Sequence, residues 1–144
     1  MATNGTIFIL LVDDDPDDVF VIRRAINSAL QGGPGAEISV AHDGDQAIDQ
    51  LRKHAAQNCL PDLILLDLNM PTMDGHTFLR TFREEQWSRN PRVVVFTTSF
   101  DVSIHNKALS EGADEAWAKP PTLPELQSVL KKILVPLAAQ QHRA

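Results

Sequence analysis

Hydrophobic residues occur along the chain in two alternating patterns: short runs without polar interruption, and longer stretches with apolar residues at helical spacing. An uninterrupted run indicates a strand whose two faces are both covered by other elements. Three strong runs and two weaker ones predict strands at residues 7–12, 37–41, 63–66, 93–96 and 115–118. The amphipathic stretches predict helices at about residues 16–30, 44–55, 74–87, 102–111 and from 122 onward.

Local signals mark the ends of several helices. Pro16, followed by Asp17 and Asp18, is typical of a first helical turn. Residues 122–125 form a capping-box pattern at the start of the last helix. Pro136 has no amide hydrogen to donate, so we expect the last helix to kink or end there.

The order of these elements predicts the fold class. Strand and helix alternate five times, without internal repeats or a long linker. Right-handed crossovers between such units give one five-stranded parallel sheet with helices on both faces, a doubly wound α/β fold. We expect a single domain over residues 1–144, with a core at about 6–135 and a C-terminal extension at 136–144. Functional side chains of such sheets lie beyond the carboxyl ends of the strands.

Composition narrows the possible partners. The net charge of −6 over 144 residues argues against binding to nucleic acid or to an anionic membrane surface. No apolar run approaches the roughly 20 residues of a membrane span, and the first residues lack the features of a signal peptide. Cys59 is the only cysteine, which excludes an intrachain disulfide. These features are those expected of a cytoplasmic protein.

Acidic residues follow two of the predicted strands directly. Asp13, Asp14 and Asp15 come after the first strand, and Asp67 comes after the third. If the two strands are neighbours, Asp13, Asp14 and Asp67 converge, and at least one pKa should rise unless a cation intervenes. Oxygen ligands of this kind suit Mg²⁺. The alternative is that these acidic residues merely end strands and cap helices. Two acidic clusters, each directly after an uninterrupted apolar strand, favour a functional site instead.

Hydroxyl groups and a cation follow two further strands. Residues 97–99, Thr-Thr-Ser, end the fourth strand, and Lys119 with Pro120 ends the fifth. Each signal is weak alone, since hydroxyl residues commonly cap helices and a lone lysine is usually solvated. Combined with the carboxylates, they provide the positioning and charge neutralisation that phosphoryl transfer requires. An aspartate carboxylate can itself be the nucleophile and become an aspartyl phosphate.

Taken in order, these motifs resemble the receiver domain of bacterial response regulators in two-component signalling. The resemblance rests on residues 10–16, 67–71, 73–75, 97–99, 112–114 and 119–120. It implies the flavodoxin-like receiver fold with strand order 2-1-3-4-5. It also implies a cis peptide bond between Lys119 and Pro120, which only a proline makes plausible.

The resemblance also implies a role for each site residue. Asp67 is the expected phosphoacceptor. Asp14 and Asp67 are expected to bind Mg²⁺ through their side chains, Asn69 through its backbone carbonyl, and Asp13 through water. The other two residues, Thr97 and Lys119, are expected to hold phosphoryl oxygens.

Finer features resemble the single-domain regulators that partner phytochrome-type histidine kinases. These features are residues 67–71, 97–99, the loop at 32–36 and the stretch 83–92. The expected function is therefore a stand-alone response regulator that accepts a phosphoryl group from a sensor histidine kinase and signals by protein contact or phosphorelay. It is not expected to be an enzyme beyond its own phosphorylation and dephosphorylation. The subgroup also implies a homodimer, with the C-terminal extension as an arm.

One position departs from the family pattern. Response regulators commonly carry Tyr or Phe three residues before the lysine, where this chain has Ala116. The aromatic residue is Trp117, one place later, and neighbours on a strand point to opposite faces. We therefore expect Trp117 to pack in the core rather than to replace the usual switch residue, although a partner surface is the other option.

Two other functions fit parts of the pattern. An aspartate-nucleophile phosphohydrolase typically has a second Asp two residues after its nucleophile, whereas this chain has Asn69. A phosphorylation-independent dimeric scaffold of the same fold has no need for clustered carboxylates. Both alternatives are therefore less favoured than the phosphorylated switch.

Overall fold

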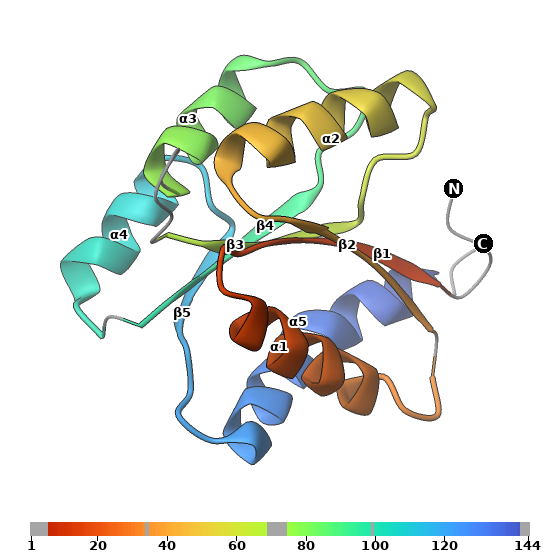
Figure 1. Ribbon diagram of the computed structural model, residues 1–144, viewed down its shortest axis with the longest axis vertical. Coiled ribbons are helices and arrows are strands. Elements are labelled where there is room, and N and C mark those ends of the chain that lie inside the picture. Colours follow the sequence, from red (N-terminus) through yellow and green to blue (C-terminus); the bar gives the residue numbers. More distant parts are fainter. Residues whose placement is uncertain (1–5, 34, 69–74, 99, 142–144) are drawn as a thin grey trace.

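The protein folds as five strands alternating with five helices (Figure 1). The structure is a computed structural model and describes residues 6–33, 35–68, 75–98 and 100–141. The strands are β1 (Ile7–Val12), β2 (Ala36–Ala41), β3 (Leu63–Asp67), β4 (Arg92–Thr97) and β5 (Glu115–Ala118). The helices are α1 (Pro16–Ala29), α2 (Gly44–Ala56), α3 (Gly75–Glu84), α4 (Val102–Ser110) and α5 (Leu123–Gln141).

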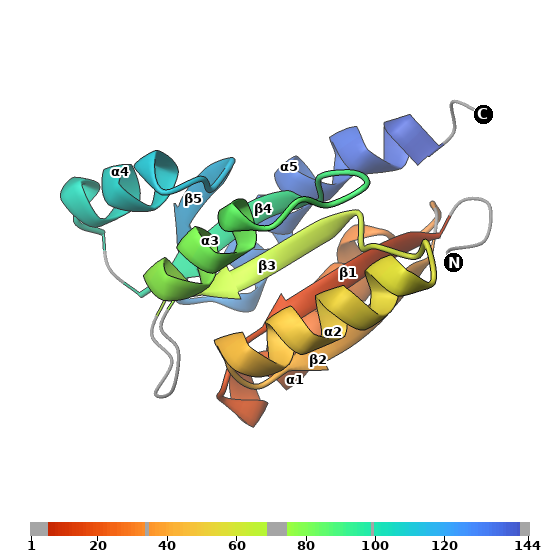
Figure 2. The ribbon, with the colours of Figure 1, turned by 90° about the horizontal axis from the view of Figure 1, so that it is seen from above.

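All five strands join one parallel sheet in the order β2-β1-β3-β4-β5. Helices α1 and α5 cover one face, and α2, α3 and α4 cover the other (Figure 1). Figure 2 shows α2 and α3 crossing in front of the strands. The predicted doubly wound, flavodoxin-like receiver fold is confirmed.

Two apolar clusters, one on each face of the sheet, form the core. On β1, Leu10 and Val12 belong to the cluster under α2, α3 and α4, whereas Ile9 and Leu11 belong to the cluster under α1 and α5. Because alternate residues of a strand enter opposite clusters, the interior positions of the central strands must be apolar. This requirement explains the uninterrupted hydrophobic runs of the sequence.

The sequence predicts a kink or an end of the last helix at Pro136 and a cis bond before Pro120, and the structure contradicts the helix end and the cis bond. Helix α5 does not end at Pro136 but continues to Gln141. Pro136 is exposed, so the carbonyl group that loses its amide donor lies on the solvent side, where water can replace the missing bond. No cis peptide bond occurs among the described residues, which include Lys119 and Pro120. The trans form is the commoner state even before proline, by about 0.5–1 kcal/mol.

Strand β5 is a short edge strand, paired only with β4. Its four residues are all half-buried. Ala116 packs against the cluster under α2, α3 and α4, and Trp117 packs against the cluster under α1 and α5. The two residues thus face opposite sides of the sheet, as predicted, and Trp117 contributes to the core. Its indole N–H donates to Glu115 over 3.0 Å.

The described helices include none that is long and apolar enough to cross a membrane.

Gly75, the first residue of α3, lies against the chain that leaves β3. Its N–H donates to the carbonyl oxygen of Leu68 over 3.0 Å. A Cβ atom at this position would lie 2.6 Å from the Cα of Leu68 and 3.0 Å from the carbonyl oxygen of Asp67. Both neighbouring atoms belong to backbone, so neither can move without shifting the segment that carries Asp67.

We therefore expect Gly75→Ala to lower the free energy of unfolding by about 1–3 kcal/mol, as overpacking does. Urea unfolding of the purified protein measures the change. Gly33→Ala is the matched control, because a Cβ there would make only an ordinary 3.5 Å contact with the carbonyl oxygen of Leu30. Equal losses in both variants would contradict this account.

Candidate functional site

The register of two neighbouring strands brings the predicted acidic residues together. Val12 of β1 is paired with Leu66 of β3. The next residues, Asp13 and Asp67, therefore occupy equivalent positions at the carboxyl edge of the sheet. Both are buried, with 1% and 8% of their surface exposed. The local backbone supports Asp13 further, because its Oδ1 accepts a hydrogen bond of 2.9 Å from the N–H of Asp15.

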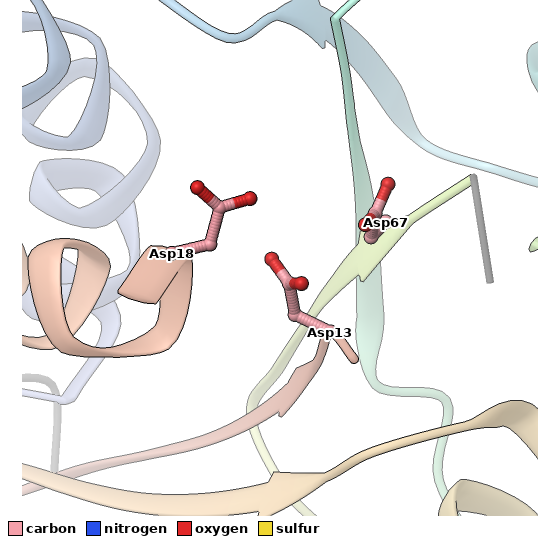
Figure 3. A group of neighbouring side chains, drawn as sticks. All are labelled: Asp13, Asp18 and Asp67. Carbon is pink, nitrogen blue, oxygen red and sulfur yellow. The ribbon is translucent and has the colours of Figure 1, made fainter. Parts of the chain in front are cut away.

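A third carboxylate completes the cluster. Oxygen atoms of Asp13, Asp18 and Asp67 all lie within 4.8 Å of one another. Asp18 comes from the first turn of α1, and Figure 3 shows the three carboxylates facing a common space between that helix and the sheet edge. The sequence pattern predicts only a helix-start role for Asp18. One feature of the sequence could have indicated this contact. Asp18 lies in the first helical turn after β1, and that turn stays close to the end of the strand.

Lys119 supplies the positive charge of the site. It follows β5, and its backbone N–H donates to the carbonyl oxygen of Thr97 over 2.7 Å. Its ammonium nitrogen lies 2.6 Å from Asp18, 3.3 Å from Asp13 and 3.8 Å from Asp67, measured to one Oδ2 atom of each. One cation therefore contacts all three carboxylates of the cluster.

The remaining predicted site residues differ in their placement. Thr97 is buried at the end of β4, on the same rim of the sheet. Asp14 is exposed and does not belong to the carboxylate cluster of the described residues. Alternation along the chain accounts for this, because Asp13 continues the face of β1 that α1 covers and Asp14 the opposite face. Asn69 lies outside the described residues, as does Ser99.

Burial and like charge raise the pKa of Asp13 to about 6, from an ordinary value of 3.8. Burial is the largest cause, and the charges of Asp67 and Asp18 add to it. The N–H of Asp15 and the ammonium of Lys119 oppose the rise without cancelling it. Asp13 therefore binds a proton more readily than an exposed aspartate does.

The pKa of Lys119 lies above its ordinary value. Burial of the ammonium group lowers this pKa, but the hydrogen bond with Asp18 and the charges of Asp67 and Asp13 outweigh that effect. Lys119 therefore remains charged at neutral pH and is a permanent counter-ion of the site.

The chemistry of the donor set fits a divalent cation. Carboxylate oxygens are the hard ligands that Mg²⁺, Mn²⁺ and Ca²⁺ prefer. Three carboxylates share one ammonium group, and a divalent ion would balance the remaining negative charge. Together with Lys119, the cluster can bind a metal ion and an anionic group side by side.

We expect Asp13→Asn to stabilise the protein without divalent cations at pH values above about 6, by about 1–3 kcal/mol. A carboxyl group whose pKa is raised by folding costs stability once it ionises. The free energy of unfolding of the wild type should therefore fall as the pH rises from about 4 to about 6. The variant has no carboxyl group at this position and should not show this fall. Urea unfolding from pH 4 to pH 8 in EDTA measures the difference, and parallel pH profiles would contradict it.

Comparison with known proteins agrees with this geometry. The family model for the response regulator receiver domain matches residues 9–131. The chain is 34% identical over 134 residues to the transcriptional regulatory protein TrcR of Mycobacterium tuberculosis, which covers 92% of this chain and 47% of TrcR. This chain thus spans about half the length of that relative.

Two solved structures are similar in fold and sequence. The phosphorylated cyanobacterial phytochrome response regulator RcpA superposes with a TM-score of 0.77 at 30% identity, over 90% of this chain and 91% of RcpA. The Mn²⁺-bound response regulator Rcp1 gives a TM-score of 0.71 at 27% identity, over 88% and 91% of the two chains. This chain therefore belongs to the response regulator receiver domains of two-component signalling.

Proposed function

We propose that Asp67 is the phosphoacceptor and that a sensor histidine kinase is the donor. The observation that carries the proposal is the closeness of the Asp13 and Asp67 carboxylates at the sheet edge, with the Lys119 ammonium 3.8 Å from Asp67. A buried carboxylate next to a second acid and a cation is suited to accept a phosphoryl group once a metal ion balances the charge.

In the proposed reaction, a carboxylate oxygen of Asp67 attacks the phosphorus of a phosphohistidine on the kinase. The new oxygen–phosphorus bond forms as the nitrogen–phosphorus bond breaks, and the histidine nitrogen keeps the electron pair. Lys119 neutralises one phosphoryl oxygen, and the hydroxyl of Thr97 donates to another. No proton needs to leave Asp67, because it reacts as the carboxylate.

Mg²⁺ is the proposed metal, which the side chains of Asp14 and Asp67 and the backbone carbonyl of Asn69 would hold directly and Asp13 through water. It would supply charge neutralisation to the phosphoryl oxygens. The Mn²⁺-bound form of the similar protein Rcp1 supports a divalent ion at this kind of site. Asp14 directly follows Asp13 in the chain and is exposed, so a hydrated ion can reach it.

The finer partner assignment is a phytochrome-type kinase. The support is similarity to RcpA, a phytochrome response regulator. The proposed output of this receiver domain is protein contact or phosphorelay in the cytoplasm. This chain has Ala116 in place of the usual switch aromatic. A change at Thr97 and Lys119 must therefore reach the surface through residues other than a rotating Tyr or Phe.

The proposed oligomer is a homodimer in which the end of α5 contacts a second copy. Val135 supports this, because it is an aliphatic side chain with 56% of its surface exposed beside the start of the C-terminal extension. A phosphohydrolase receives no comparable support. A scaffold independent of phosphorylation does not account for two buried carboxylates and a third that share one ammonium group.

Acetyl phosphate with Mg²⁺ should add one phosphoryl group to the wild type, and Asp67→Asn should abolish the addition. The asparagine keeps the shape of the side chain but is not a nucleophile. Intact-mass spectrometry measures the addition, with EDTA as the metal-free control and Asp17→Asn as a charge-matched control on α1. Phosphorylation of Asp67→Asn to the wild-type extent would sink the proposal.

Val135→Glu should weaken self-association roughly tenfold or more, since it places a charge in a proposed apolar contact. Sedimentation of the full chain over a range of concentrations measures the dissociation constant. Gln127→Glu adds the same charge elsewhere on α5 and should leave self-association unchanged. A wild type that is monomeric at all concentrations would refute the dimer.

A further inference from the structure

The nearest partner of Lys119 is not a residue of the sheet edge. Its ammonium nitrogen is 2.6 Å from Asp18, which belongs to α1, against 3.8 Å from Asp67. Asp18 also differs in environment, because 41% of its side-chain surface is exposed while only 10% of the Asp67 side chain is. The strongest bond of the cation is thus made to the most hydrated carboxylate of the cluster.

A phosphoryl group on Asp67 needs the same ammonium group. Its oxygens carry more negative charge than the carboxylate they replace, and each is a stronger partner for an ammonium donor. Lys119 has three N–H donors, and Asp18 and Asp13 already engage it. A phosphoryl oxygen would share this one ammonium group with Asp18, and any movement of Lys119 away from α1 toward Asp67 would lengthen its short bond to Asp18.

The surroundings leave room for this movement. A pocket of about 340 Å³ lies between α1 and the segment after β5, with Asp18 and Lys119 both on its wall. The remaining wall is largely apolar, from Val21, Ile22 and the two prolines after Lys119 among others. Asp18 can turn into solvent there, so its release requires no rearrangement of the core.

We propose that Asp18 is a positioning residue: it holds Lys119 in the unphosphorylated protein and competes with the phosphoryl group for that ammonium. The inference rests on the proposed function, in which Asp67 carries the phosphoryl group. Asp18 thereby stabilises the resting state, and the energy of the Asp18–Lys119 bond is subtracted from the stability of the phosphorylated state.

Removal of Asp18 should therefore favour the phosphorylated state. The test uses beryllofluoride, which occupies the place of the phosphoryl group on an aspartate, at saturating Mg²⁺, with affinity measured by fluorine NMR titration. Asp18→Asn should bind it roughly three- to tenfold more tightly than the wild type. Asp18→Glu keeps the carboxylate and should return most of the wild-type affinity. Asp17→Asn removes the same charge from an exposed neighbour and should have no effect.

A double-mutant cycle separates competition from simple charge repulsion. If Asp18 acts through Lys119, the gain from Asp18→Asn should vanish in a Lys119→Gln background, measured at higher beryllofluoride concentration. If Asp18 only repels the anion, the gain should persist or grow, because Lys119 no longer screens it. Persistence of the gain would overturn the proposal.

The remaining outcomes are also decisive. Weaker binding by Asp18→Asn would overturn the proposal, because Asp18 would then support the bound state, for instance as a metal ligand. Equal affinity of Asp18→Asn and Asp17→Asn would overturn it as well. Failure of the wild type itself to bind beryllofluoride with Mg²⁺ would instead refute the proposed role of Asp67.

Discussion

The parallel register of β1 and β3 is the constraint on which the site depends. It holds Asp13 and Asp67 at equivalent positions, and the hydrogen-bonded ladder prevents the two carboxylates from separating to relieve their repulsion. Positive charge at the site offsets the repulsion between these two carboxylates. Lys119 arrives from β5, Asp18 lies against the same ammonium from α1, and a divalent cation is the natural further neutraliser.

The sequence was most informative where burial permits only one kind of residue. The interior of a central strand covered on both faces must be apolar, so the first polar residue marks the strand's end, and Asp13 and Asp67 could be placed there from the sequence. Asp18 was not readable in that way. An acid in a first helical turn is already explained by the helix dipole, and only the packing of α1 beside the sheet edge shows its contact with Lys119.

The other differences between the structure and the sequence predictions also have local causes. The rule that proline ends helices assumes that the freed carbonyl has no substitute partner, which fails at the exposed Pro136. The expected cis bond before Pro120 came from family likeness rather than from residues that require it. Strand alternation correctly placed Ala116 and Trp117 on opposite faces, because that geometry is independent of tertiary context.

The cation of the site depends on the least supported strand of the sheet. β5 has four half-buried residues and a single neighbour, whereas the acids follow strands paired on both sides. Edge strands with little burial open locally at a lower free energy than the global unfolding. Fraying of β5 would therefore withdraw Lys119 while Asp13 and Asp67 stay in place. Hydrogen exchange at β5 amides is thus a direct gauge of how often the site loses its positive charge, without any unfolding of the protein as a whole.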